Sequence, residues 1–310
     1  MADLYLGIDL GGTFVKLGVC DARGEVAATL SIPTRPDRGA EDTVQRIGEA
    51  ADTLQRKTER VKATCAGVPG PLDLERRILV RANNLPGWDN VRFPQMLGNR
   101  LGMPTYMEND ANCAAWGEYV AGAGKDFRSL VVYTLGTGIG GGIVINGDLW
   151  IGASGAAGEL GHMSIDPNGP MCGCGQPGCL EQYASATAVA KKWGKGTAKD
   201  CFDAARKGDA KAMDVINWAS NGLATGVANM IHVLHPDIIV LAGGMAQAGD
   251  ILLDKVREGV KRRVFGVFIE KIRIETSKVR GDDAGWLGAA LWAARKLETR
   301  DIREPTATRV

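Results

Sequence analysis

The chain has 310 residues, and its 37 lysines and arginines against 36 aspartates and glutamates give a formal net charge of +1. This balance gives no electrostatic reason to expect a nucleic-acid or membrane-surface protein. A hydrophobic fraction of 45% and a charged fraction of 24% exclude a disordered or collagen-like chain, and the length suggests two domains.

Neither a membrane span nor an export signal is expected. The longest apolar runs, near 238–242 and 287–294, are far shorter than the roughly 20 residues that cross a bilayer. The N-terminus lacks a basic segment followed by an apolar one. A cytoplasmic, reducing location is therefore expected.

The first part of the chain opens with a strand, a glycine turn and a second strand. In chain order it predicts three strands, a helix, two strands and a helix, at 4–8, 15–19, 25–32, 40–60, 61–66, 104–107 and 111–121. From residue 130 the same opening pattern restarts. The second part predicts two strands, a helix, a strand, a helix, a strand and a final helix, at 130–135, 142–145, 210–233, 238–242, 254–263, 272–276 and 284–297.

This repetition predicts an α/β protein with two lobes and a ligand cleft between them. We expect a small domain at 1–118, completed by the C-terminal helix at about 284–300. A large domain is expected at 119–283, including a cysteine-rich loop.

Two glycine turns have the composition of phosphate-binding loops. Asp9-Leu10-Gly11-Gly12-Thr13 offers backbone N–H groups and a hydroxyl to phosphate oxygens, and Asp9 can hold a hydrated Mg²⁺. The alternative is a tight hairpin turn in which Asp9 bonds neighbouring amides. The second turn, at 136–142, has the same layout, so two facing turns would grip a triphosphate. Its Gly-x-Gly-x-x-Gly leads into a strand, which does not support a dinucleotide fold.

Asp110 is the candidate catalytic carboxylate. It lies between a short predicted strand and a predicted helix, where it can accept the proton of a hydroxyl that attacks a γ-phosphate. The alternative is that Asp110 simply caps the helix N-terminus.

Three of the seven cysteines are clustered close after a histidine, which predicts a metal site. His162, Cys172, Cys174 and Cys179 form a closed tetrahedral ligand set for structural Zn²⁺. A disulfide is the alternative, but Cys-x-Cys neighbours are awkward to bridge and the expected compartment is reducing. The remaining cysteines are expected to be small buried hydrophobic residues: Cys20, Cys65, Cys113 and Cys201.

Glu159 and Glu181 flank the cluster, so a bound metal would fix their positions. Both carboxylates can accept hydrogen bonds from a polyol, and His162 can donate to the same ligand from its second nitrogen. His232 and His235 have no such context and are interpreted as residues of a helix C-terminus.

Six motifs together resemble the ROK family (repressors, open reading frames and sugar kinases) and, within it, the bacterial glucokinases. The resemblance runs from about residue 4 to 298. The motifs are Asp9-Leu10-Gly11-Gly12-Thr13, Asn83-Asn84-Leu85-Pro86-Gly87-Trp88, Glu108-Asn109-Asp110-Ala111-Asn112, the glycine segment 136–142, Glu159-x-Gly-His162 and the Cys-x-Cys-Gly-x-x-Gly-Cys-Leu-Glu that ends at Glu181.

The resemblance implies an actin/hexokinase-like ATPase fold built from ribonuclease H-like repeats, usually dimeric. It implies ATP- and Mg²⁺-dependent phosphorylation of D-glucose at its 6-hydroxyl, a reaction of glycolysis, with Asp110 as general base. It assigns sugar binding to Asn84, Asn109, Asp110, Glu159, His162 and Glu181. It assigns zinc to His162 and the three clustered cysteines. Contacts to ATP are assigned to Asp9, Gly11, Gly12, Thr13, Thr137, Gly138, Gly243 and Gly244.

Two alternatives remain open. The same pocket residues serve kinases of mannose, fructose, N-acetylglucosamine or N-acetylmannosamine, and a sugar-sensing protein without turnover would keep the sugar contacts.

Repressor members carry a DNA-binding segment before the first phosphate turn. Only eight residues precede Asp9 here, so no binding to nucleic acid is expected.

Overall fold

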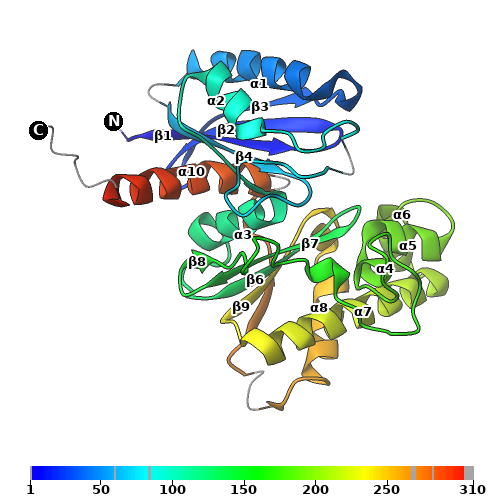
Figure 1. Ribbon diagram of the computed structural model, residues 1–310. Coiled ribbons are helices and arrows are strands. Elements are labelled where there is room, and N and C mark those ends of the chain that lie inside the picture. The colour runs from blue at the N-terminus through cyan, green and yellow to red at the C-terminus, as the bar shows by residue number, and fades with distance from the viewer. Residues whose placement is uncertain (1, 59–60, 83–84, 267–269, 281–282, 304–310) are drawn as a thin grey trace, which may run out of the picture. The chain divides into compact units, whose positions relative to one another are not determined.

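The computed structural model describes residues 2–58, 61–82, 85–266, 270–280 and 283–303 (Figure 1). It divides into two units. Unit 1 comprises Met1–Ala121, Ile151–Ala157 and Asp283–Val310, and unit 2 comprises Gly122–Trp150 and Gly158–Asp282. Residues 151–157, which the sequence interpretation assigned to the second domain, belong to unit 1.

Unit 1 is built on a five-stranded sheet in the order β3-β2-β1-β4-β5. The first three strands are antiparallel neighbours, whereas β4 runs parallel to β1 and β5 runs parallel to β4. The strands are β1 (Leu4–Leu10), β2 (Phe14–Asp21), β3 (Val26–Pro33), β4 (Val61–Val68) and β5 (Thr105–Asn109).

Helices cover both faces of this sheet (Figure 1). One face packs against α1 (Gly39–Gln55) and α2 (Phe93–Leu101), and the other against α10 (Ala284–Arg303), which also contacts α3 (Asp110–Ala121). A Cβ on Gly7 of β1 would clash with the backbone oxygen of Trp286. Glycine therefore allows α10 to lie directly on the strand.

Unit 2 repeats the same topology with the order β10-β9-β6-β7-β8. Strand β6 is antiparallel to β7 and parallel to β9, just as β1 is antiparallel to β2 and parallel to β4. The repetition predicted from the sequence is therefore present in the strand order. The strands are β6 (Leu130–Leu135), β7 (Ile139–Ile145), β8 (Asp148–Leu149), β9 (Ile238–Ala242) and β10 (Arg273–Thr276).

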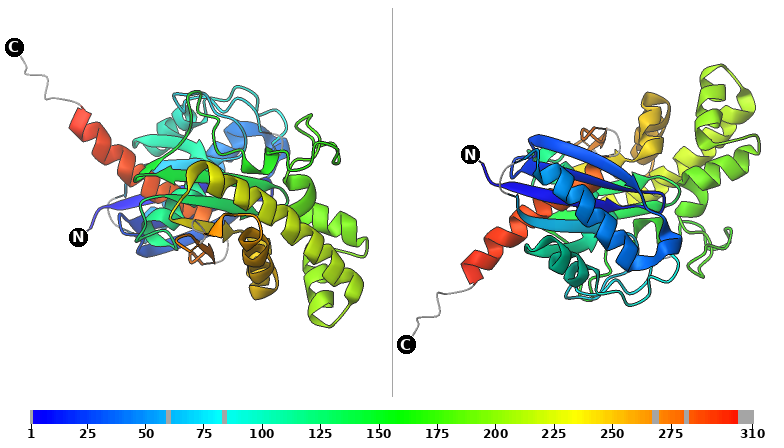
Figure 2. Two further views of the ribbon diagram at one scale, coloured as in Figure 1. Left: turned by 90° about the horizontal axis from the view of Figure 1, so that it is seen from below. Right: turned by 90° about the horizontal axis from the view of Figure 1, so that it is seen from above.

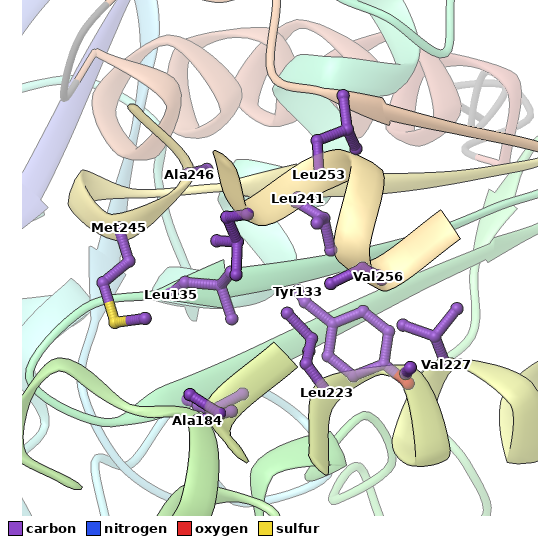
Figure 3. Packing of buried hydrophobic residues seen from close by; sticks show 14 of the residues in the cluster. Tyr133, Leu135, Ala184, Leu223, Val227, Leu241, Met245, Ala246, Leu253 and Val256 are labelled. Atoms are coloured by element: carbon purple, nitrogen blue, oxygen red, sulfur yellow. The ribbon is translucent and has the colours of Figure 1, made fainter. Parts of the chain in front are cut away.

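The core of unit 2 lies between its sheet and two helices, α7 (Ala210–Leu234) and α8 (Asp250–Lys261). Figure 3 shows Tyr133 of β6 beside Leu223 and Val227 of α7 and Val256 of α8. The Tyr133 hydroxyl donates to the Gly226 carbonyl at 3.0 Å, so this buried polar group is satisfied. In both views of Figure 2, α5 (Ala186–Trp193) and α6 (Ala198–Arg206) lie beside α7.

Several short elements were not predicted from the sequence. These are the helices α2, α5 and α6, the two-residue strand β8, a single turn α4 (Glu181–Ala184), and the 3₁₀ turns η1 (Pro36–Arg38), η2 (Leu160–His162) and η3 (Gly244–Ala248). Strand β7 begins at Ile139, so Gly140 and Gly141 belong to the strand rather than to the turn. A Cβ on Gly141 would clash with the Leu160 side chain, which explains a glycine inside a strand.

Among the described residues, no helix combines the length and the apolar character needed to cross a bilayer.

Candidate active site and metal centre

The first glycine turn joins β1 to β2 and is held by the residue that follows β3. The Gly11 N–H donates to the Phe14 carbonyl at 3.0 Å. The buried Thr34 donates from its hydroxyl to the Gly11 carbonyl at 2.6 Å and from its N–H to the Thr13 carbonyl at 2.8 Å. This turn is therefore fixed from outside the hairpin, and Thr13 stays exposed.

Asp9 lies against the start of α10. A Cβ on Gly285, the second residue of that helix, would lie 2.8 Å from the carboxyl carbon of Asp9. Only a residue without a side chain allows this approach, and the positive end of the helix favours a carboxylate there.

Asp110 lies at the same sheet edge as the first turn. The strand register pairs Asp9 with Gly67 and Gly67 with Glu108. Neighbouring strands are about 4.8 Å apart. Asp9 and Glu108 lie on strands that flank β4 on its two sides, so their backbones are only about 10 Å apart. Asp110 follows two residues later as the first residue of α3. The carboxyl ends of parallel strands are where ligands bind in open α/β sheets.

Asn109, and not Asp110, caps the helix. The Asn109 side-chain oxygen accepts from the N–H groups of Ala111 at 2.9 Å and Asn112 at 3.2 Å. Asp110 accepts from the N–H of Ala111 at 2.8 Å through one carboxylate oxygen. The capping role that competed with a catalytic role for Asp110 therefore belongs to its neighbour.

Beneath this junction lies an ion pair that the sequence did not reveal. Nε of Arg76 lies 3.1 Å from Oε2 of Glu108. The other Glu108 oxygen accepts from the backbone N–H of Asn109 at 2.9 Å and from the side-chain nitrogen of Asn112 at 3.0 Å. Both charged side chains are nearly excluded from solvent. Arg76 stands in a loop without any repeating pattern, so no sequence signal pointed to it.

The second glycine turn is contacted by Glu181. Gly136 donates to the Gly138 carbonyl at 3.0 Å, which closes the turn before β7 begins. The Ile139 N–H donates to Oε2 of Glu181 at 3.0 Å. A Cβ on Gly138 would clash with that same oxygen, so the carboxylate lies directly on the turn.

Gly243 and Gly244 follow the neighbouring parallel strand, β9. Ala242 is in register with Thr134, so this glycine pair and the second glycine turn leave the sheet at the same edge. Gly243 has a φ of 87°, and a Cβ there would lie 2.7 Å from the Leu135 carbonyl oxygen. Gly244 faces open space.

The four predicted metal ligands come together in unit 2. One donor atom from each of His162, Cys172, Cys174 and Cys179 lies within 4.8 Å of the others. The Cys174 and Cys179 sulfurs are 3.5 Å apart, and the Cys172 sulfur is 3.6 Å from Nδ1 of His162. A disulfide needs about 2.05 Å, whereas ligand atoms around a tetrahedral zinc are about 3.3–3.8 Å apart. The cysteines are free thiols, and their spacing fits a metal site.

The cluster thiols differ in acidity. A backbone hydrogen bond at Gln176 lowers the pKa of the exposed Cys174, whereas burial raises the pKa of Cys179 to about 12. A bound cation would favour the thiolate form of both. The four cysteines outside the cluster are buried as predicted, and burial raises the pKa of Cys20 to about 12.

Asn84 lies outside the residues that the structure describes. All the other candidate site residues lie within them. Unit 1 carries Asp9, Gly11, Gly12, Thr13, Asn109 and Asp110, and unit 2 carries Thr137, Gly138, Glu159, His162, Glu181, Gly243, Gly244 and the three cysteines. The cleft expected between lobes stays a prediction.

His232 lies in the last turn of α7 and His235 caps it, as predicted.

The sequence model that defines the ROK family matches residues 5–296 of this chain. A glucokinase of Thermotoga maritima is 38% identical over 92% of this chain and 95% of its own length. A solved ROK family glucokinase of Streptomyces griseus in complex with glucose and AMPPNP is 32% identical, with a TM-score of 0.83 over 94% of this chain and 99% of the other. A ROK hexokinase of Thermus thermophilus is 32% identical, with a TM-score of 0.83 over 96% and 99%.

This chain therefore belongs to the ROK family, and the predicted actin/hexokinase-like fold is confirmed. Its relatives also include an N-acetylmannosamine kinase of Yersinia pestis, 30% identical over 94% of this chain and 99% of its own length. A putative xylose repressor of Caldicellulosiruptor is 31% identical over 89% of this chain and 75% of its own length.

Proposed function

We propose that this protein is an ATP-dependent hexokinase that phosphorylates D-glucose at its 6-hydroxyl to give glucose 6-phosphate and ADP. The observation that carries the proposal is the position of Asp110, a carboxylate at the sheet edge that also carries the first glycine turn. Family membership and the glucokinases among the relatives support it.

Asp110 is the general base of the proposed reaction. The sugar 6-oxygen forms a bond to the γ-phosphorus, the bond from that phosphorus to the β–γ bridging oxygen breaks, and the hydroxyl proton moves to Asp110. Asp110 is suited to this role because Asn109 caps α3 in its place. The helix N-terminus also favours a charged carboxylate before proton transfer.

The nucleotide is proposed to bind through both glycine turns. Gly11, Gly12 and Thr13 in unit 1, and Thr137 and Gly138 in unit 2, would contact its phosphates. Gly243 and Gly244 would lie near the adenosine, and Asp9 would hold a hydrated Mg²⁺, which neutralises charge on the transferred phosphoryl group.

The sugar is proposed to bind through Asn84, Asn109, Glu159, His162 and Glu181. His162 would hold the metal through Nδ1, the atom that faces Cys172, and donate to the sugar through Nε2. We propose that the cluster binds Zn²⁺ as a structural ion that fixes these residues, because three thiols and one imidazole at these distances match its preferred ligand set.

The test is an assay of ADP release over several sugars and phosphoryl donors. We expect glucose with Mg-ATP to give the largest kcat/KM among glucose, mannose, fructose, N-acetylglucosamine and N-acetylmannosamine. A larger value for another sugar would reassign the substrate. N-acetylmannosamine is the second candidate, because an N-acetylmannosamine kinase is among the relatives. Sugar binding without ADP release would indicate a sugar-sensing protein. The homodimer and the cytoplasmic location stay predictions.

A further inference from the structure

The residues that follow the metal cluster hold the second glycine turn. We call Glu181–Thr187 the bridge segment. Its contacts with residues 136–139 are three hydrogen bonds: Ile139 N–H to Glu181 Oε2 at 3.0 Å, Ala186 N–H to the Gly136 carbonyl at 2.9 Å, and the Thr187 hydroxyl to the Thr137 carbonyl at 2.7 Å. Each of the three peptides that join residues 136 to 139 is therefore tied to one short stretch of chain.

The bridge segment is in turn tied to the metal cluster. Only Leu180 separates it from the buried ligand Cys179. The Leu180 N–H donates to the Met163 carbonyl at 2.9 Å, and its buried side chain packs on Gly226 of α7. Oε1 of Glu181 lies 4.0 Å from the Cys172 sulfur. A shift of the cluster would therefore move Glu181 directly.

The cluster also reaches the turn from its other side. Gly161, directly before the ligand His162, packs so closely that a Cβ there would clash with the Ile139 carbonyl oxygen. Leu160 occupies the space that a side chain on Gly141 would need. The start of β7 thus lies between the segment before His162 and the segment after Cys179.

These hydrogen bonds decide where the turn's own N–H groups point. In a trans peptide the C=O and the following N–H point in opposite directions. Because Ala186 and Thr187 bind the carbonyls of Gly136 and Thr137, the N–H groups of Thr137 and Gly138 are directed away from the bridge segment. Two successive N–H groups aimed to one side form an anion-binding nest.

We propose that Thr187 and Glu181 are positioning residues for the phosphoryl donor, and that metal in the cluster thereby supports nucleotide binding as well as sugar binding. This inference rests on the proposed function, because it takes the second turn to bind nucleotide phosphates. Thr187 has no place among the candidate residues found from the sequence, and the donor-side role of Glu181 is added to its proposed role in sugar binding.

The first test compares Thr187→Val, which keeps the shape and removes the hydroxyl, with Thr187→Ser, which keeps the hydroxyl. Binding of Mg-ADP without sugar is measured by calorimetry on the full, metal-loaded chain. Loss of one hydrogen bond is expected to raise the Kd of Thr187→Val about two- to tenfold, with Thr187→Ser within twofold of wild type. The Kd for glucose and the melting temperature stay unchanged, since Thr187 is exposed.

A second comparison uses the two carboxylates beside the cluster. Glu181→Ala and Glu159→Ala are both expected to weaken glucose binding. Only Glu181→Ala is expected to weaken Mg-ADP binding, because Glu181 is the one of these two carboxylates that accepts a hydrogen bond from the turn. Equal ADP affinities in these two variants would contradict the donor-side role of Glu181.

A third measurement follows the turn itself by hydrogen exchange in metal-loaded protein and in reduced, chelator-treated protein. Metal removal is expected to speed exchange of the Ile139 amide and to raise the Kd for Mg-ADP. If wild type forms glucose 6-phosphate while Thr187→Val and metal-free protein bind ADP normally, the inference is wrong and the proposed function stands. If loaded wild type neither binds ADP nor forms product, both are wrong.

Discussion

The side chain of Arg76 is bonded to Glu108 at 3.1 Å, and the two side chains are only 10% and 2% exposed. Since Glu108 also binds the backbone of Asn109 and the side chain of Asn112, this ion pair supports the residues on both sides of Asp110. It anchors the junction at which β5 ends and α3 begins.

Arg76→Met is therefore expected to leave a buried carboxylate without its partner. Breaking a buried pair in this way lowers the free energy of unfolding by about 3–5 kcal/mol, measured by chemical denaturation. The matched control is Arg77→Met. Arg77 is 77% exposed and pairs with Glu75 at the surface, so its loss should change stability by about 1 kcal/mol or less. Equal effects of the two substitutions would contradict a supporting role for Arg76.

Gly285→Ala is expected to disturb Asp9, because the added Cβ would lie 2.8 Å from its carboxyl carbon. Displacement of a group that would hold Mg²⁺ should lower kcat/KM for Mg-ATP about tenfold to a hundredfold while the Kd for glucose is kept. Gly98→Ala, in helix α2 of the same unit, is the control. Its Cβ would lie 3.3 Å from the Thr105 hydroxyl and 3.7 Å from the Met103 carbonyl oxygen, far from Asp9, and its kinetics should match wild type. Unchanged kinetics in Gly285→Ala would contradict the proposed role of Asp9 in binding the phosphoryl donor.

Asn109 combines two roles that substitutions can separate. Asn109→Ala removes the cap of α3 and should lower stability by about 1 kcal/mol, together with glucose affinity. Asn109→Ser replaces the side-chain amide by a hydroxyl, which can still cap the helix but lacks the NH₂ group. It should keep the stability and still lose glucose affinity, measured by calorimetry. Normal glucose binding by Asn109→Ser would show that the amide does not contact the sugar.

Cys174→Ser is expected to reduce metal content, thermal stability and glucose affinity together, because His162 and Glu181 lose the ion that fixes them. Elemental analysis of freshly purified, reduced protein measures the first effect directly. Met171→Ala, at a residue that is 65% exposed in the same loop, should leave all three unchanged. Absence of zinc from the freshly purified, reduced wild-type protein would contradict the proposed zinc site.

The parts of the site that are local in the chain were predictable from the sequence. The strand–turn–strand repeat, the position of Asp110 after β5 and the Cys₃His set are patterns within a few to about twenty residues. The contacts that support them join residues 32, 42 and 50 positions apart: Arg76 with Glu108, Glu181 with Ile139, and Thr187 with Thr137. No periodicity encodes such pairs, because the tertiary fold brings them together.

The errors in the predicted elements have a similar cause. Gly140 and Gly141 were interpreted as turn residues because glycine disfavours strands. They lie in β7, where the segment around Leu160 packs too closely for a side chain at Gly141. The helices α2, α5 and α6 are only eight or nine residues long, too short for a clear helical period.

The most direct test of the central claim is a comparison of Asp110→Asn with wild type, using calorimetry for glucose binding and a coupled assay for glucose 6-phosphate. The amide keeps the shape of the side chain but cannot take the hydroxyl proton. We predict near-normal glucose affinity and a kcat that falls by about a hundredfold or more. An Asp110→Asn protein that forms glucose 6-phosphate at the wild-type rate would contradict the assignment of Asp110 as the base.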